Sequence, residues 1–593
     1  MKMIKNIALG LSLMGMMTSC VESTLDKSPE LAFSEDNAFA NFQVTQTYAF
    51  GFYTIFPGYD LSVPNSEWDG DLMMHNNSNQ GSAWIWGRQT IPTTSGIWNF
   101  SFVRRVNIML QNLDASDMSE AEKNHWRAIG YFFRAYDYYD KIAAYGDVPW
   151  IDRVLTDDDE LLYAPRTPRA EVAQQMLDDL LFAEENIMEP GTNGIPSNSI
   201  SSDVIRAFIT RFGLFEGTWR KYHGLQEAET FLRASADAGA ELIANNPTLH
   251  PNYNELFNSA DLAGVPGILL YKSYENGVLT HVLTSRHRNS AGNWDITKRG
   301  ADSYLMKDGQ TRWNSDLFET DQDPYAEFRN RDLRMLYTIT PPFRVKPVSG
   351  NRLAWEYTDD EQDREYIDFM EGITDATQKQ LPSRNHAGYI LRVSPHFRDF
   401  NEGDPYNVSR TGYKLFKYYN RLHDIQNNDF NDAPIFRMGE VLVNYAEAKW
   451  ELGEFDQTVA DATINMLRER GEVAPMTVSA VGTDFDPTRD PEVDPILWEI
   501  RRERGIELMA EGFRFNDLRR WKKMDYTNDP KLGRWIVGAD VNNRIPIQGG
   551  ADEGYIQFFP GTPPAWEDYQ YLYPVPSQEI ALNPSLDQNP GWE

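Results

Sequence analysis

Cysteine is almost absent from this chain, which has one cysteine, Cys20, in 593 residues. A single cysteine cannot form an intrachain disulfide, and it excludes a metal site built from cysteines. Basic residues are also scarce, with 56 Lys and Arg against 88 Asp and Glu and a net charge of −32. Because a polyanion of this size repels phosphate backbones, the composition excludes nucleic acid as a partner.

Long apolar runs are missing too, because no stretch of 18 apolar residues follows the first residues of the chain. The chain begins with two lysines, an apolar stretch from Ile7 to Met17, and then Thr18-Ser19-Cys20. This pattern is typical of a secretory signal, and a lone cysteine at its end indicates the lipid-modified first residue of a bacterial lipoprotein. We therefore predict a lipoprotein signal peptide over 1–19 and lipidation at Cys20. The alternative is a simple cleavage site that happens to contain a cysteine.

Common catalytic and cofactor motifs are also missing. The sequence contains no HExxH, GxSxG, P-loop or GxGxxG motif, and its nine histidines do not cluster at metal-ligand spacing. The acidic run 157–160 offers carboxylates for calcium, but it lacks the spaced ligand loop with a glycine. We interpret the run as a solvated loop, predict no catalytic residue, metal site or cofactor, and leave calcium open.

Three glutamates, Glu503, Glu507 and Glu511, are spaced to lie on one helix face. A surface-anchored glycoside hydrolase is the hypothesis that such paired carboxylates suggest. Arginines keep neighbouring carboxylates ionised, which is unsuitable for a general acid. We therefore predict a structural ion network with the arginines nearby in sequence, which are Arg501, Arg502, Arg504, Arg514, Arg519 and Arg520.

Hydrophobic residues make up 41% of the chain and aromatic residues 13%, which is enough to order a large core. Seven windows show the three- and four-residue spacing of helices, over 126–143, 172–183, 204–215, 231–243, 441–452, 459–467 and 496–509. Their pairing and size favour tetratricopeptide-like helix pairs without a regular repeat. Irregular but aromatic-rich stretches cover 57–97, about 250–430 and 527–593.

Several segments, taken in order, resemble the SusD/RagB family. They are Ala144-Tyr-Gly-Asp-Val-Pro149, Asn330-Arg-Asp332, Thr411-Gly-Tyr413, Asp432 to Ala448, Ile464 to Arg470, Glu503 to Trp521, Tyr573-Pro-Val-Pro576 and Gln588-Asn-Pro-Gly-Trp592. The resemblance implies a mainly α-helical fold, with about four tetratricopeptide-like helix pairs and long loop-rich insertions. It divides the mature chain into an N-terminal helical region, 20–260, and a C-terminal region, 261–593, with a loop-rich insert at about 261–430.

The same resemblance implies a function. SusD-like proteins are lipid-anchored in the outer membrane, face the medium, and capture oligosaccharides for a SusC-like TonB-dependent transporter without catalysing a reaction. We therefore expect a glycan-binding lipoprotein with such a transporter as its partner. Two alternatives remain, which are the same architecture serving peptides or another non-sugar nutrient, and the surface-anchored glycoside hydrolase.

A sugar site needs flat aromatic rings for the C–H faces of the ligand and polar groups for its hydroxyls. The stretch 68–89 has this composition, and Trp84 and Trp86 point the same way if the chain is extended there. The predicted ligand-binding residues are Trp84, Trp86, Arg88, Trp68 and Asp69, with Trp294 and Trp313 from the loop-rich insert as secondary candidates. The alternative is that these tryptophans pack under loops. Five others are expected in the core, which are Trp98, Trp126, Trp219, Trp498 and Trp521.

Overall fold

The computed structural model describes residues 39–75, 82–288, 294–343, 345–347, 355–369, 409–419, 428–541, 543 and 545–593. The fold is mainly helical, as predicted, and its strands are short. The predicted signal peptide, Cys20 and part of the predicted insert lie outside the described residues. No helix of the described part has the length and apolar character needed to cross a bilayer.

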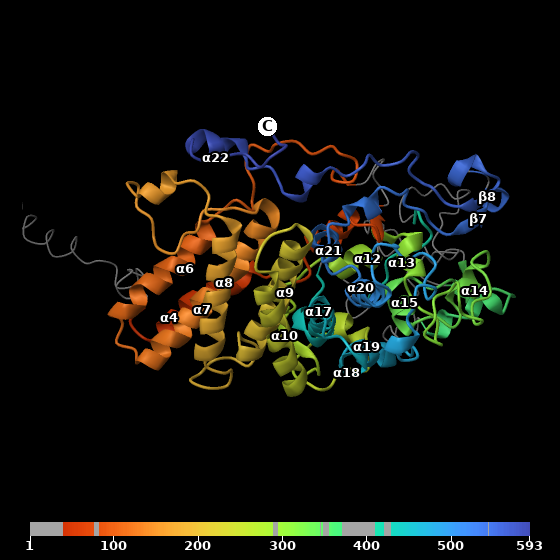
Figure 1. The fold of residues 1–593 in the computed structure, drawn as a ribbon. Coiled ribbons are helices and arrows are strands. Elements are labelled where there is room, and N and C mark those ends of the chain that lie inside the picture. The colour runs from red at the N-terminus through yellow and green to blue at the C-terminus, as the bar shows by residue number, and fades with distance from the viewer. Residues whose placement is uncertain are drawn as a thin grey trace, which may run out of the picture.

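Long helices pack side by side in the N-terminal half (Figure 1), where α7 contacts α6 and α8, and α9 contacts α10. Their bounds are α4 Phe42–Phe50, α6 Ser101–Asn112, α7 Glu120–Tyr145, α8 Arg169–Asn186, α9 Ser202–Tyr222 and α10 Ala228–Asn245. Ser119 and Glu122 cap the start of α7 reciprocally, and the helix ends at Gly146, where φ is 73°. A positive φ suits glycine, so the predicted end of this helix is confirmed.

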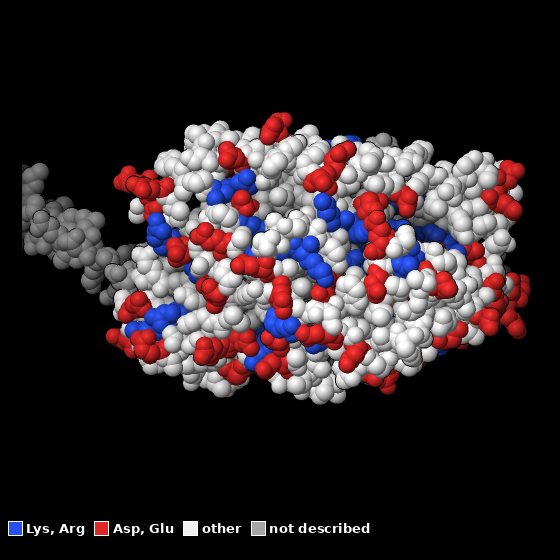
Figure 2. All heavy atoms as spheres, viewed as in Figure 1, with Lys and Arg blue, Asp and Glu red and all other residues white. Residues whose placement is uncertain are grey.

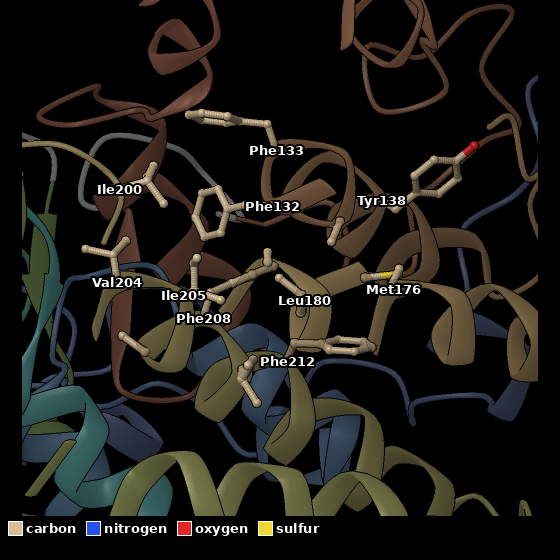
Figure 3. Close-up of a cluster of buried hydrophobic side chains, with 14 of the residues drawn as sticks. Phe132, Phe133, Tyr138, Met176, Leu180, Ile200, Val204, Ile205, Phe208 and Phe212 are labelled. Carbon is tan, nitrogen blue, oxygen red and sulfur yellow. The ribbon is translucent and has the colours of Figure 1, made fainter. Parts of the chain in front are cut away.

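The main core lies between these helices (Figure 3). Phe132 and Phe133 of α7 and Phe208 and Phe212 of α9 are completely buried there. Burying one such side chain contributes about 1.5–3 kcal/mol relative to leaving it exposed. The aromatic spacing that predicted the helices is therefore the spacing of their buried faces.

Two glycines, Gly213 and Gly217, bring α9 close to α10. A Cβ atom at Gly213 would lie 2.6 Å from the carbonyl oxygen of Phe231, and one at Gly217 would lie 2.7 Å from the Leu232 side chain. A glycine inside a helix costs about 1 kcal/mol relative to alanine. In return, the two glycines allow the backbones of α9 and α10 to approach each other closely.

Shorter helices form the C-terminal half, with bounds α17 Met438–Glu451, α18 Gln457–Ala462, α19 Ile464–Arg470, α20 Pro495–Glu507, α21 Arg514–Arg520 and α22 Ser577–Leu582. The single helix expected over 459–467 is wrong, because Thr463 has non-helical φ and ψ of −132° and −87° and separates α18 from α19. The final segment, with α22, runs back along the N-terminal helices (Figure 1), where Asn589 bonds to the carbonyl of Tyr145.

Short elements fill the loop-rich part of the chain, and each described strand pairs with one antiparallel partner. The pairs are β1 Met73–His75 with β3 Trp294–Ile296, β2 Ile268–Lys272 with β6 Ala433–Arg437, β4 Val345–Pro347 with β5 Trp355–Tyr357, and β7 Trp535–Val537 with β8 Glu553–Tyr555. The short helices are α5 Ser62–Ser66, α11 Glu255–Asn258, α12 Leu283–Arg288, α13 Lys298–Asp302, α14 Pro324–Phe328 and α15 Leu333–Thr338. These elements place loops around the ends of α20 and α21.

The three glutamates form a buried ion network, as predicted, and Glu507 lies at its centre. The predicted partners are wrong, because within the described residues none of the six arginines nearby in sequence pairs with these glutamates, whose partners come from other segments of the chain. Its fully buried carboxylate contacts Arg437 of β6, Arg470 of α19 at 2.6 Å and Arg334 of α15 at 3.2 Å. Burial disfavours its charge, but the three guanidiniums hold the pKa of Glu507 well below its usual value. Glu503 is equally buried against Arg334, so these two carboxylates are sequestered from any substrate.

Glu507→Ala should lower the free energy of unfolding by about 3–5 kcal/mol, because it leaves three buried guanidiniums without their shared partner. Urea unfolding followed by circular dichroism measures the loss. Glu229→Ala is the matched control, since that side chain is 80% exposed, and it should change stability by less than about 0.5 kcal/mol. Equal effects of the two variants would contradict the role of Glu507.

Candidate functional site

A cavity of about 420 Å³ lies between α13, α20, α21 and the segment 526–532. It is lined by helix faces on one side and by loops on the other. Its wall includes Asp71, Leu72, Thr297, Lys298, Arg299, Asp302, Ser303, Trp313, Asp486, Thr488, Trp498, Arg501, Arg502, Gly505, Arg514, Trp521, Tyr526, Thr527, Asp529, Pro530, Lys531, Leu532 and Gln548. Aromatic rings and charged groups therefore share one wall.

Four aromatic side chains line the cavity, of which Trp521 is buried and Trp313, Trp498 and Tyr526 are at least partly exposed. Trp498 donates from Nε1 to Asp486 at 2.6 Å, and the hydroxyl of Tyr526 donates to Asp490 at 2.7 Å. The two rings lie 6.1 Å apart at 70° to each other. Trp313 is 38% exposed. The two hydrogen bonds fix the positions of the Trp498 and Tyr526 rings at the cavity, and the guanidinium of Arg299 lies over the Tyr526 ring at 5.3 Å.

Charged groups form the polar part of the wall, and Asp71 organises several of them. Its carboxylate accepts two hydrogen bonds from Arg514, at 2.7 and 3.0 Å, and one from Arg299 at 3.2 Å. Although burial opposes ionisation, the two arginines lower the pKa of Asp71 to about 2. Asp486 binds Arg502 in the same way. The guanidiniums are thus held rigidly at the cavity surface.

The helix α20 presents one face to this space. Trp498, Arg501, Arg502 and Gly505 follow each other at helical spacing and all line the cavity. A Cβ atom at Gly505 would lie 3.3 Å from Leu72. The absence of a side chain there leaves the helix backbone itself as part of the wall.

A second, smaller cavity of about 30 Å³ adjoins the first and shares Pro530 and Lys531 with it. Trp68 and Trp86 line it. The Ser82 hydroxyl donates to Asp69 beside this cavity, and burial raises the pKa of Asp69 to about 6. Lys531 therefore connects the loop around residue 68 with the main cavity.

The structure divides the predicted site residues between several places. Trp313 lines the larger cavity, and Trp68 and Trp86 line the smaller one. Asp69 lies beside the smaller cavity, and Arg88 is exposed. Their roles in ligand binding stay predictions.

Two tryptophans lie where they offer no ring face to either cavity. Trp84 packs among other aromatic rings, with its centroid 4.5 Å from that of Tyr573. The extended geometry expected at Trp84 and Trp86 is wrong, because residues 83–87 form a turn. Trp294 lies on β3, is 3% exposed, and donates from Nε1 to Asn65 at 2.9 Å. It packs under loops, which was the alternative interpretation.

Sequence analysis missed Trp498 and Tyr526 as wall residues. Trp498 was expected in the core, but the structure leaves it partly exposed at the cavity. Its place between the buried positions Leu497 and Ile500, with Gly505 two turns further on, is a pattern that distinguishes the cavity face from the core face. Tyr526 follows no periodic pattern, because it lies in a short 3₁₀ turn, Met524–Thr527.

Within the described residues, no group of three or more His, Cys, Asp or Glu side chains is placed to hold a metal ion. The acidic run 157–160 forms an exposed turn, as interpreted. Asp159 in this run accepts a hydrogen bond from the Leu161 amide and pairs with Arg153 at 3.0 Å.

Comparison with known proteins decides the family. Residues 269–592, more than half of the chain, match the sequence model described as the SusD family. The chain belongs to the SusD family. Residues 51–214 of this SusD-family protein also match a model described as "starch-binding associating with outer membrane".

Individual relatives agree with this assignment. The chain is 24% identical to SusD-like protein P2 of Formosa agariphila over 500 residues, which are 83% of this chain and 79% of that protein. A SusD-like carbohydrate-binding protein from Bacteroides fragilis superposes with a TM-score of 0.65 at 18% identity, covering 93% of this chain and 99% of that one. A laminarin-binding SusD-like protein gives a TM-score of 0.51 at 17% identity, covering 93% and 98%. At these identities the structural likeness shows the fold.

Glu67→Gln should remove the contribution of this carboxyl group to the pH dependence of the free energy of unfolding. The buried Glu67 accepts hydrogen bonds from the amides of Gly512 and Phe513, and burial raises its pKa to about 7. The folded state therefore binds this proton more tightly than the unfolded state, and stability falls as pH rises from about 4.5 through 7. Glutamine keeps the acceptor without the charge.

Urea unfolding at pH 5, 6 and 8 should show the glutamine variant gaining about 1–3 kcal/mol over the unmodified protein between the two extremes. The exposed Glu229→Gln should show no such gain. Parallel pH profiles of the Glu67 variant and the unmodified protein would contradict the assignment.

Proposed function

We propose that this SusD-family protein is a surface-exposed lipoprotein that binds oligosaccharides in the larger cavity and delivers them to a SusC-like TonB-dependent transporter. The observation that carries the proposal is the set of aromatic faces, Trp313, Trp498 and Tyr526, within one charged and polar wall. The carbohydrate-binding and laminarin-binding names of two structural neighbours and the starch-binding description of a matching family model support it.

The wall has the chemistry that a sugar requires. A pyranose ring offers apolar C–H faces, which aromatic rings cover, and hydroxyls at its edge, which amides, carboxylates and guanidiniums bind. Each aromatic contact contributes about 0.5–1.5 kcal/mol beyond area burial, and each hydroxyl hydrogen bond about 0.5–1.5 kcal/mol after exchange with water. After ordering costs, binding of about −4 to −8 kcal/mol follows, which is millimolar to micromolar affinity. Such affinity suits a protein that must release what it captures.

The proposed protein binds its ligand without cleaving it. The glutamates that suggested a glycoside hydrolase are sequestered by arginines, with Glu503 and Glu507 fully buried. Lipid attachment at Cys20 would anchor the protein in the outer membrane, facing the medium, beside its transporter. The family-model description of outer-membrane association supports this placement.

Trp313→Ala combined with Trp498→Ala should weaken glycan binding about tenfold or more, because it removes two of the three stacking surfaces. Affinity electrophoresis against a panel of polysaccharides, followed by titration calorimetry with the oligosaccharide that binds, measures the loss. Tyr163→Ala is the control, since Tyr163 is exposed and lies on the short turn Glu160–Tyr163, outside both cavities.

Gly505→Met provides an independent test of the same site. The new side chain would enter the cavity from α20 and lower affinity while every aromatic ring stays in place. A combined Trp84→Ala and Trp86→Ala variant tests the 68–89 loop. Loss of binding there, with none in the cavity variants, would move the site to that loop. The proposed function would be overturned if the protein bound peptides but no glycan, or if it released reducing sugar from a polysaccharide.

Cys20→Ser should abolish lipid attachment, because only the cysteine thiol accepts the acyl-bearing group at this position. Cells expressing the variant should incorporate no labelled palmitate into the protein and should release it from the membrane fraction. Ser19→Ala is the neighbouring control and should remain membrane-bound. Labelling that persists in the Cys20 variant would exclude the proposed anchor.

A further inference from the structure

The charge of the larger cavity is opposite to that of the molecule. Among the described residues that line it, six side chains are basic and four are acidic. The whole chain has 88 acidic and 56 basic residues. Figure 2 shows acidic side chains scattered over the face in view and Lys and Arg atoms gathered in a hollow near α13. The net positive charge of the cavity wall therefore differs from the net negative charge of the chain as a whole.

The acidic groups of the wall are already engaged by the basic ones. Asp71 is shared by Arg514 and Arg299, Asp486 binds Arg502, and Asp302 binds Lys298. Asp529 is 76% exposed at the rim and lies 3.6 Å from Arg299. The carboxylates therefore hold the cations in position, and they leave hydrogen-bond donors of the cations for a ligand.

Lys531 has no carboxylate of the described residues in direct contact with it, and the carboxylates of Asp69, Asp71 and Glu67 act on its charge from further away. It lies where the two cavities meet and donates to the carbonyl oxygens of Trp68 at 2.8 Å and Met73 at 2.6 Å. No carboxylate of the described residues lies within 4.0 Å of its ammonium. An ammonium has three donors, and a charge removed from water stays costly when its nearest carboxylates, here Asp69, Asp71 and Glu67, are not in direct contact with it. An anionic group on a ligand would relieve that cost.

Two arginines have donors available beside this lysine. Arg514 uses Nε and Nη2 for Asp71, and its Nη1 makes no hydrogen bond within the described part of the chain. The side chain of Arg299 is 41% exposed at the cavity. Guanidiniums bind carboxylate and sulfate oxygens through paired N–H groups, so both residues suit an anion.

We infer that the ligand of the larger cavity is an anionic glycan, whose carboxylate or sulfate group is bound by Lys531, Arg514 and Arg299 while its rings contact the aromatic side chains. This inference rests on the proposed glycan-binding function and narrows its substrate class. The carboxylate and the sulfate share the same recognition chemistry, and the experiment distinguishes them.

Titration calorimetry of the full chain compares matched pairs of probes. Galacturonate oligosaccharides and their methyl esters differ in the carboxylate charge and one methyl group per esterified residue, and dextran sulfate and dextran differ in the sulfate groups. At least one anionic probe should bind about tenfold more tightly than its neutral partner. Lys531→Met and Arg299→Gln should each remove most of that preference. Lys307→Met, a lysine 46% exposed and outside the cavity wall, is the control and should retain it.

A pH profile separates ligand contact from a structural role. Burial lowers the pKa of Lys531 to about 8, so affinity for the anionic probe should fall as pH rises from 7 to 9. In Lys531→Met the affinity should be low and should not change with pH. In Lys531→Arg the affinity should be restored and should also not change with pH, because arginine stays charged. A higher salt concentration should weaken binding of the anionic probe and should leave binding of the neutral probe unchanged.

Equal affinity for charged and neutral partners, or an unchanged preference in both Lys531→Met and Arg299→Gln, would overturn the inference. If neutral glycans bind in a Trp313-dependent manner without any preference for charge, the inference fails and the proposed function stands. If no glycan binds at all, charged or neutral, both fail together.

Discussion

The fully buried carboxylate of Glu507 joins four elements of the C-terminal half. Arg437 ends β6, Arg470 ends α19, Arg334 lies in α15, and Glu507 itself lies at the end of α20. Charges removed from water are costly unless they meet partners in good geometry, so each of these elements must take up its native position for the others to be stable. The short helices of this half also contribute to apolar clusters, and the shared ion contacts add directional constraints on their relative positions.

The same helix connects this network with the cavity. One face of α20 presents Glu503 and Glu507 to buried arginines, and another presents Trp498 and Gly505 to the open space. The position of the cavity wall is therefore set by ion pairs on the opposite side of the helix. Rigid positioning matters for weak ligands, since a preformed site loses little conformational entropy when it binds.

Sequence periodicity predicted the long helices because their buried faces are aromatic and continuous. The end of α7 was predictable from Gly146, whose positive φ is the usual end of a helix. The break at Thr463 was not, because the apolar spacing continues across it and only the backbone angles change. Local pattern carries no information about such a break when tertiary contacts cause it.

The candidate site was less predictable than the fold. Tryptophan content alone does not separate a buried ring, such as Trp294, from an exposed one, such as Trp313, because both lie in irregular segments of similar composition. Their environments depend on segments far away in sequence, as in the hydrogen bond from Trp294 to Asn65. The ion network was predictable in kind, since arginines and glutamates alternate along one helix. Its partners were not predictable, because Arg334, Arg437 and Arg470 come from other segments of the chain.

Residues 589–592 lie beside the end of the long helix α7. The amide of Asn589 donates to the carbonyl oxygens of Tyr145 and Tyr573 and its side-chain oxygen accepts from Arg166, while Trp592 donates to Leu572. A nascent chain cannot make these contacts until residues 589–592 have been synthesised. The end of α7 therefore gains these hydrogen bonds from a segment 444 residues further along the sequence, so the two halves of the fold depend on each other for their completion.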